Sequence, residues 1–357
     1  MKQIGFVIAC LSLFIGFYIY KHGISPGTPA EKKIVVSPSP HPTIAKKQGK
    51  QSLFVPYWTI GTGLVAAEEY DELIYFGIAP SETGIDKTDA GFSVLTTFIK
   101  TGGKQKKILT IRMTDSRTNS AVLENREWQN RIATEAARIA KDNAFDGVLL
   151  DFELASLSFD SVIKKISDFT TTVEKAVKAE NLTFGITIYG DTFYRLRPYN
   201  VSQLQQSADK VYIMMYDFSK ARENPGPNFP LSGKDSYGYD VVTMITDFSN
   251  IVPKEKITVV FGMFGYDWPV DKAGKSTQNA TSISFNEAQQ KFITKCVPAN
   301  CVVKRDEKSG ELRAEYDDIN GIHHVVWFED TESVEKKKEY LLKNGITSFA
   351  FWAYSYF

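Results

Sequence analysis

The stretch FDGVLLDFE at residues 145–153 decides how this chain folds, because it places two acidic residues, Asp151 and Glu153, at alternating positions of an apolar run. It follows an amphipathic helical pattern and predicts a buried strand. Successive side chains of a strand point to opposite faces, so Leu149, Asp151 and Glu153 share one face. Two carboxylates on one buried face repel each other and lose hydration, which raises the pKa of one of them toward neutrality. A carboxyl group of that kind suits a general acid.

The pattern around this strand repeats along the chain, because strand-like and helix-like segments alternate after residue 50. Apolar residues recur at helical spacing over residues 128–139, before the strand, and over residues 162–177, after it. The alternation predicts an α/β fold, a TIM (β/α)8 barrel over residues 51–357. No Gly-x-Gly-x-x-Gly pattern follows the first strand, which argues against a dinucleotide-binding sheet. The predicted strands are residues 53–58, 74–76, 107–113, 147–153, 183–189, 210–216, 257–264 and 348–352.

Residues 270–324 interrupt the alternation after the seventh predicted strand, and they are too many for a single loop. Ser284 and Glu287 form a capping-box pattern, which predicts the start of a short helix. Residues 302–305 and 311–316 flank a Ser-Gly pair and predict a hairpin. We therefore expect a small α+β insertion after the seventh strand.

The first 50 residues differ from the rest of the chain. An uncharged apolar run at residues 4–20 lies between two lysines, and as a helix it would be about 26 Å long, near the lower limit for crossing a membrane. We expect a signal anchor over residues 1–23, with the barrel outside the cytoplasm at the cell surface. The alternatives are a cleaved signal peptide, which would give a secreted protein, and a lipoprotein site at Cys10. The proline-rich residues 24–50 predict a disordered tether.

Composition narrows the range of partners. The 42 basic and 42 acidic residues balance, so nothing in the charge indicates a nucleic-acid partner. Cys296 and Cys301 would form a small disulfide loop outside the cytoplasm, and the alternative is two free thiols. Four spaced metal ligands do not occur, so we expect neither a metal site nor a cofactor. We expect a monomer that is attached to a membrane by its N-terminal helix.

Several motifs in register resemble glycoside hydrolase family 18, which includes chitinases and N-acetylglucosaminidases. Residues 146–153 match the family's Asp-Gly-x-Asp-x-Asp-x-Glu signature except at Leu149, where the family has Asp, or Asn in its spore-cortex branch. Residues 214–217, MMYD, are similar to the Met-x-Tyr-Asp that ends the sixth strand. Residues 260–268 are similar to the seventh strand and its tail, and Trp352 is similar to the tryptophan that ends the eighth. The resemblance covers the whole globular part and is greatest for spore and cell-wall lysins.

The resemblance implies a retaining, substrate-assisted mechanism, in which the 2-acetamido oxygen of the sugar attacks the anomeric carbon. Glu153 would protonate the leaving oxygen and then activate water, Asp151 would orient the acetamide, and Tyr216 would hydrogen-bond to the acetamide carbonyl. Asp217 would bind sugar hydroxyls or support the acetamide site, and Trp352 would stack on the sugar. For the aromatic residues among the other substrate-binding candidates, which are named next, packing in the core is at least as good an interpretation as sugar binding. The remaining substrate-binding candidates are Asp146, Tyr57, Trp58, Tyr189, Met214, Tyr266 and Trp268.

Leu149 is the departure from the family pattern that matters for chemistry. It offers Asp151 no second partner, so we expect Asp151 to stay turned toward Glu153, with slower turnover or a shifted pH optimum. Two classes of function remain. One is a cell-surface hydrolase of β-1,4-linked N-acetylglucosamine polymers, peptidoglycan or chitin-like; the other is a non-catalytic, lectin-like barrel, or more weakly a structural wall anchor. Glu153 favours the hydrolase, because lectin-like relatives commonly lose this residue.

Overall fold

The computed structural model describes residues 49–62, 67–101, 103–154, 158–296 and 298–357. The chain divides into a unit of residues 1–44 and a unit of residues 45–357, and every described residue belongs to the second. The predicted anchor at residues 1–23 and nearly all of the predicted tether at residues 24–50 lie outside the described residues. Within the described part of the chain, no helix is both long and apolar enough to cross a membrane.

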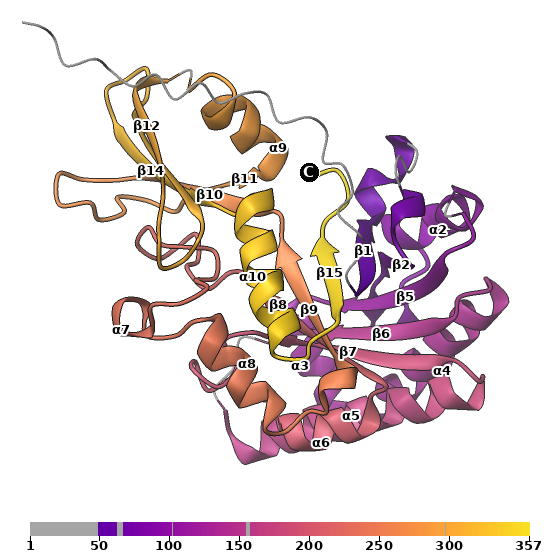
Figure 1. Ribbon diagram of the computed structural model, residues 1–357. Coiled ribbons are helices and arrows are strands. Elements are labelled where there is room, and N and C mark those ends of the chain that lie inside the picture. Colours follow the sequence, from indigo (N-terminus) through magenta and orange to yellow (C-terminus); the bar gives the residue numbers. More distant parts are fainter. Residues whose placement is uncertain (1–48, 63–66, 102, 155–157, 297) are drawn as a thin grey trace, which may run out of the picture. The chain divides into compact units, whose positions relative to one another are not determined.

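Parallel strands close into a barrel, as the sequence predicts (Figure 1). Their order around the barrel is β1-β15-β9-β8-β7-β6-β5-β2, and each predicted strand overlaps one of them. Because all of these strands are parallel, their C-terminal ends meet at one end of the barrel. The strands are β1 (Lys50–Pro56), β2 (Glu72–Ile78), β5 (Lys106–Met113), β6 (Gly147–Phe152), β7 (Thr183–Tyr189), β8 (Lys210–Met215), β9 (Ile257–Gly262) and β15 (Ser348–Trp352).

Helices cover the outside of the barrel (Figure 1). The two that the apolar spacing predicts are α4 (Arg126–Asp142) and α5 (Asp160–Ala179). The Asn125 side chain caps α4 by accepting hydrogen bonds from backbone N–H groups of its first turn, and Ile132 and Ala136 are buried on its inner face. Other elements are α2 (Ala90–Thr101), α3 (Ser116–Glu124), α6 (Val201–Ser207), α7 (Lys234–Tyr237), α8 (Val241–Ser249), α10 (Thr331–Lys343), the 3-10 turns η1 (Tyr57–Thr62), η2 (Ala67–Glu69) and η3 (Lys254–Lys256), and the strand pair β3 (Pro80–Ser81) and β4 (Gly84–Ile85).

Side chains along β6 alternate between the core outside the barrel and the barrel interior. Val148 and Leu150 belong to the main core between strands and helices, whereas Leu149 belongs to a separate buried cluster inside the barrel. Asp151 lies on the same face as Leu149, nearer to the C-terminal end, and Glu153 follows directly after the strand. The predicted division of this stretch into two faces is confirmed. The other buried members of the interior cluster are Phe54, Ile74, Phe76, Ile108, Tyr212, Val260, Ala350 and Ala353.

The predicted α+β insertion is present, but it is longer than residues 270–324. It runs from residue 264 to residue 328, because the strand that leaves the barrel after β9 pairs at once with the strand that returns. Its sheet is antiparallel in the order β11-β10-β14-β13-β12, and Cys301, within the last of these strands, forms a disulfide with Cys296. Its elements are β10 (Phe264–Pro269), β11 (Thr281–Ser284), α9 (Phe285–Ala288), the π-helical turn η4 (Gln289–Ile293), β12 (Ala299–Arg305), β13 (Leu312–Asp317) and β14 (His323–Phe328).

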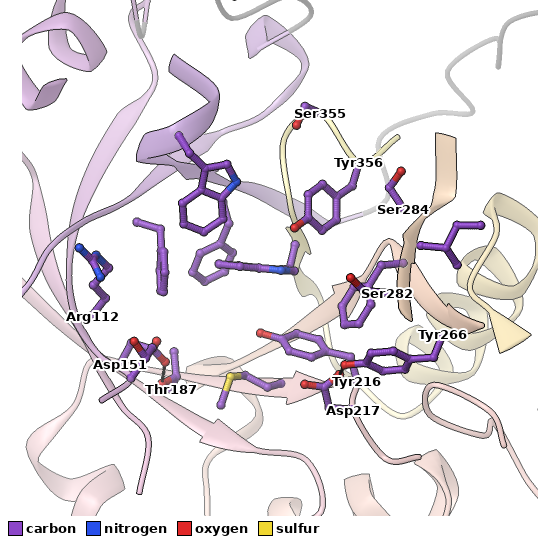
Figure 2. Close-up of a pocket in the computed structure, with 18 of the residues that line it drawn as sticks. Arg112, Asp151, Thr187, Tyr216, Asp217, Tyr266, Ser282, Ser284, Ser355 and Tyr356 are labelled. Carbon is purple, nitrogen blue, oxygen red and sulfur yellow. Dashed lines mark hydrogen bonds between the residues drawn. The ribbon is translucent and has the colours of Figure 1, made fainter. Parts of the chain in front are cut away.

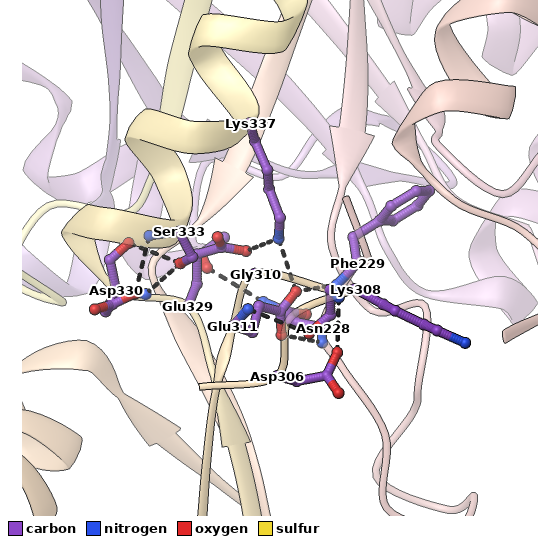
Figure 3. Close-up of polar contacts among 12 residues, drawn as sticks. Asn228, Phe229, Asp306, Lys308, Gly310, Glu311, Glu329, Asp330, Ser333 and Lys337 are labelled. Carbon is purple, nitrogen blue, oxygen red and sulfur yellow. Dashed lines mark hydrogen bonds and ion pairs between the residues drawn. The ribbon is translucent and has the colours of Figure 1, made fainter. Parts of the chain in front are cut away.

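A buried ion triad joins the insertion to the barrel (Figure 3). Lys337 of α10 contacts Glu311 of the insertion at 2.7 Å and Glu329, just after β14, at 2.6 Å; all three side chains have 0% exposure. Glu311 also accepts hydrogen bonds from the backbone N–H groups of Asn228 and Phe229, at 2.6 and 2.8 Å. The triad therefore holds the long segment that follows β8, where two of the predicted site residues lie.

Candidate active site

A cleft of about 850 Å³ opens at the C-terminal end of the barrel (Figure 2). One wall comes from the strand ends and the other from the start of the insertion and the C-terminal residues. Predicted site residues that line it are Trp58, Asp151, Glu153, Met214, Tyr216, Asp217, Tyr266 and Trp352. Lining residues that the motifs do not predict include Arg112, Thr114, Thr187, Ser282, Asn286, Glu287 and Tyr356.

Asp151 and Glu153 form the acidic centre of the cleft. Asp151 is 3% exposed, and burial, reinforced by the charge of Glu153, raises its pKa to about 8. Burial also raises the pKa of Glu153, against a hydrogen bond of 2.6 Å that Tyr189 donates to it. The Thr187 hydroxyl donates a hydrogen bond to Asp151. The predicted rise in carboxyl pKa on this face is thus present, and it arises mainly from desolvation.

Backbone contacts fix the end of β6, from which both carboxylates project. The Asn119 side chain donates hydrogen bonds to the carbonyl groups of Met113 and Glu153, at 2.6 and 2.5 Å. Tyr199 donates a hydrogen bond of 2.7 Å to the carbonyl of Phe152. These buried contacts hold the chain in one conformation where it leaves the barrel, which is what precise placement of an acid requires.

Tyr216 and Asp217 directly follow β8. Asp217 has a left-handed backbone, φ 56°, which is unusual for a residue with a side chain. Asn228 supports this conformation by accepting a hydrogen bond of 2.9 Å from the Asp217 N–H, and Tyr266 donates one of 2.7 Å to the Asp217 carboxylate. Figure 2 shows the Tyr266 hydroxyl directed at the Asp217 carboxylate, with Tyr216 beside this pair. Burial raises the pKa of Asp217 as well.

Trp352, at the end of β15, supplies an aromatic floor. Its ring lies 4.7 Å from Phe76, 5.6 Å from Phe54 and 6.3 Å from Trp58, measured between ring centres. Trp58 is 51% exposed, so its ring is accessible at the cleft mouth. Flat, half-buried aromatic rings of this kind bind the apolar faces of sugars at a low entropy cost.

Comparison with known proteins agrees with this geometry. The model of glycosyl hydrolases family 18 matches residues 84–356. The chain belongs to this family.

Its relatives are distant in sequence but share the fold. The putative sporulation-specific glycosylase YdhD of Bacillus subtilis (strain 168) is 21% identical over 234 residues, which are 65% of this chain and 52% of that protein. The chain thus spans about half the length of this curated relative. The spore cortex-lytic enzyme SleL of Bacillus cereus has a TM-score of 0.70 at 17% identity, over 87% of this chain and 72% of that one. A family 18 N-acetylglucosaminidase from Paenibacillus barengoltzii has a TM-score of 0.72 at 18% identity, over 87% and 96%.

Four predicted substrate-binding residues do not line the family 18 cleft. Asp146 precedes β6, at the opposite end of that strand, and accepts a hydrogen bond of 2.8 Å from the Lys107 N–H. Trp268 has 0% exposure in the core of the insertion sheet, so its core-packing interpretation is the correct one. Tyr57 is not among the lining residues; its ring lies 4.8 Å beneath the Arg112 guanidinium. Tyr189 contacts Glu153 from behind rather than lining the cleft.

Some lining residues that the motifs do not predict could have been found from the register between neighbouring strands. Arg112 pairs with Asp151 across β5 and β6, and Thr187 follows two residues after Gly185, which pairs with Leu149 across β6 and β7. Aligning the parallel strands would have placed both side chains beside the acids. No comparable signal marks the contributions from β11, α9 and the C-terminus, because they depend on how the insertion packs.

Leu149 leaves Asp151 with a different partner from the one expected. The carboxylate bonds to Thr187 of the neighbouring strand, and no hydrogen bond joins it to Glu153 among the described residues. Within that same part of the chain, no group of three or more His, Cys, Asp or Glu side chains is arranged to hold a metal ion. The groups that the cleft offers to a ligand are carboxyls, tyrosine hydroxyls, an arginine and aromatic rings.

Proposed function

We propose that this protein hydrolyses β-1,4-linked N-acetylglucosamine polymers with retention of configuration, using Glu153 as general acid and base. The observation that carries the proposal is the pair Asp151 and Glu153, on one face at a strand end, both with raised pKa, beside an aromatic floor. A carboxyl group that keeps its proton near neutral pH is what protonation of a leaving oxygen requires.

The proposed reaction uses the substrate's own acetamido group. The acetamido carbonyl oxygen attacks the anomeric carbon while Glu153 gives its proton to the departing glycosidic oxygen. Asp151 accepts a hydrogen bond from the acetamide N–H and stabilises the positive charge that forms there, and Tyr216 donates one to the acetamide oxygen. Glu153, now a carboxylate, takes a proton from a water molecule that attacks the anomeric carbon from the face that the leaving group vacated. This attack breaks the bond between the anomeric carbon and the acetamido oxygen and restores the acetamido group. The product therefore keeps its configuration.

The names of the relatives support a cell-wall polymer as substrate. They include a spore cortex-lytic enzyme, a sporulation-specific glycosylase and an N-acetylglucosaminidase. Peptidoglycan and chitin-like polymers share the β-1,4-linked N-acetylglucosamine unit that the mechanism needs. Both lie outside the cytoplasm, which agrees with the location that the N-terminal sequence predicts.

The test is product analysis with the parent protein and Glu153→Gln. The parent should release oligosaccharides from peptidoglycan strands or chitin oligomers, detected by mass spectrometry, with the β-anomer appearing first by NMR. Glu153→Gln keeps the shape of the side chain and removes the transferable proton, so kcat should fall by about 10²–10⁴-fold while sugar binding persists. Binding without any cleavage by the parent would instead favour the lectin-like alternative.

A further inference from the structure

Asn228 is a buried junction between the barrel, the insertion and the segment that carries Asp217. It is 1% exposed, and its side-chain oxygen accepts the hydrogen bond from the Asp217 N–H. Its backbone carbonyl accepts a second hydrogen bond, of 2.8 Å, from the N–H of Phe218. Two successive N–H groups after β8 are thus bonded to one residue. This arrangement holds Asp217 in its left-handed backbone conformation, which a residue with a side chain keeps only where its surroundings enforce it.

The remaining polar groups of Asn228 fix it to the insertion. Its side-chain amide donates hydrogen bonds to the carbonyl groups of Gly262, where β9 ends, and Phe264, where β10 begins, at 3.2 and 3.1 Å. Its backbone N–H donates the bond of 2.6 Å to Glu311, the carboxylate that the buried ion triad holds (Figure 3). With these three bonds and the two above, Asn228 uses its whole hydrogen-bonding capacity and is held in one orientation.

This junction fixes both members of a pair that faces the cleft. Tyr266 lies two residues after Phe264 in β10 and donates its hydrogen bond of 2.7 Å to one oxygen of the Asp217 carboxylate. Both side chains line the cleft (Figure 2). The second carboxylate oxygen accepts no hydrogen bond from any described residue, so it can accept one from a sugar hydroxyl. Its direction follows from where Asn228 holds the backbone of Asp217 and of Phe264.

We propose that Asn228 is a positioning residue for the glycosidase reaction, which acts on the sugar through Asp217 and Tyr266, and that Glu311 keeps Asn228 in place. This rests on the proposed function and extends it to residues behind the cleft, because neither Asn228 nor Glu311 lines it. The insertion then takes part in the reaction by fixing a carboxylate that follows a barrel strand, since small displacements of a binding group are costly in rate.

The experiment is a double-mutant cycle between Asn228→Ala and Asp217→Gly, with kcat/KM measured on peptidoglycan strands or chitin oligomers. Glycine removes the carboxylate and adopts a left-handed backbone without strain, so Asn228 has nothing left to position there. We expect Asn228→Ala to lower kcat/KM about tenfold in the parent, and by no more than about twofold in the Asp217→Gly background.

The matched control is Gln129→Ala. Gln129 is another buried amide, which donates hydrogen bonds to the carbonyl groups of Val122 and Leu123 and does not line the cleft. Gln129→Ala should lower the melting temperature, as Asn228→Ala should, but leave kcat/KM unchanged. The comparison separates loss of stability from loss of positioning.

The pH–rate profile gives a second readout that loss of stability alone does not move. The charge of Asp217 raises the pKa of Glu153. Asp217→Gly should therefore lower that pKa and move the alkaline limb of kcat/KM to lower pH. Asn228→Ala releases the carboxylate from its fixed position and should move the limb in the same direction by a smaller amount.

Glu311→Gln tests the same path if Asn228→Ala does not fold. It removes one acceptor for the N–H groups of Asn228 and Phe229 but leaves Lys337 and Glu329 as a one-to-one ion pair. It should lower kcat/KM by a smaller factor, and the loss should again disappear in the Asp217→Gly background.

Equal losses in both backgrounds would overturn the inference, as would folded Asn228→Ala and Glu311→Gln variants with the parent kcat/KM. Both results would leave the proposed function intact. A parent that cleaves no glycan would refute the proposed function instead. The same cycle, measured by calorimetry as the Kd for a chitin oligomer, would then decide whether Asn228 positions Asp217 for sugar binding.

Discussion

The chemistry of Asp151 depends on one hydroxyl group from the neighbouring strand. Thr187 donates to the carboxylate, and this hydrogen bond holds down a pKa that burial raises. Leu149, directly below, is apolar and fully buried, so it supplies nothing in exchange. The hydrogen-bond partner of Asp151 therefore comes from β7, from a residue that the family signature does not include.

Thr187→Val should therefore harm activity more than its size suggests. The change keeps the shape but removes the hydrogen bond, so the pKa of Asp151 should rise further and kcat/KM should fall about tenfold. Thr110→Val is the control: Thr110 pairs with Leu149 in register, and its hydroxyl is buried without a partner among the described residues. Thr110→Val should be neutral or slightly stabilising. Equal pH–rate profiles for the two variants would contradict this role for Thr187.

Tyr189 should affect the alkaline limit of activity through Glu153. The Tyr189 hydrogen bond to Glu153 favours the ionised carboxylate and so lowers its pKa. Tyr189→Phe removes that bond, which raises the pKa of Glu153 and keeps the acid protonated to higher pH. The alkaline limb of kcat/KM against pH should move upward. A limb that moved downward, with melting temperature unchanged, would show that Glu153 is not the group that titrates there.

Prediction from sequence succeeded at the residue scale where a motif and strand alternation agreed. Asp151, Glu153, Tyr216 and Trp352 all reach the cleft, because each stands at a strand end whose position the apolar pattern defines. Asp146 belongs to the same motif, but it stands at the opposite strand end. Side chains on an adjacent strand, such as Thr187, can be placed only when the register between the two strands is known. No single segment of the sequence contains that register.

At the scale of elements, the buried triad is one of the contacts that tie the insertion to the barrel segment that carries Asp217. Lys337→Met should leave Glu311 and Glu329 as two unpaired buried carboxylates, at a cost of about 3–5 kcal/mol in the free energy of unfolding. The control on the same helix is Lys343→Met, which breaks only an exposed pair with Glu339 and should cost less than about 1 kcal/mol. Denaturant unfolding measures both.

A further variant shows whether charge is the cause. Combining Lys337→Met with Glu311→Gln and Glu329→Gln removes the unpaired charges and should restore part of the lost stability. If Lys337→Met were as stable as Lys343→Met, the triad would not be what secures this interface.

The boundary between the seventh barrel strand and the insertion was predicted wrongly. The seventh strand was expected to run to residue 264, but β9 ends at Gly262 and the chain enters the insertion sheet as β10. The apolar run continues unbroken across this point, because both strands are buried, so periodicity contains no boundary signal. Trp268 was misassigned for the same reason: a buried insertion strand and a sugar-binding tail have the same aromatic pattern.

At the scale of the whole molecule, the N-terminal sequence predicts how the cleft reaches an immobile polymer. A tether of residues 24–50 would reach about 80 Å if extended as polyproline, and about 30 Å on average if flexible. An anchor at residues 1–23 would therefore confine the barrel to a layer of wall next to the membrane. The full chain should sediment with membranes, resist high salt and dissolve in detergent.

Removing the anchor separates tethering from catalysis. A chain that lacks residues 1–23 should be soluble and should cleave soluble oligosaccharides with the parent kcat/KM, since the described cleft uses no residue before Phe54. It should lose activity on intact cell walls at equal expression, because the local concentration that the tether provides is gone. N-terminal sequencing of the mature protein distinguishes the alternatives: a start after residue 20 would indicate a cleaved signal peptide, and a start at Cys10 would indicate a lipid anchor. Release of the full chain by high salt alone would contradict both membrane-bound forms, because an apolar helix or acyl chain is not displaced by screening charge.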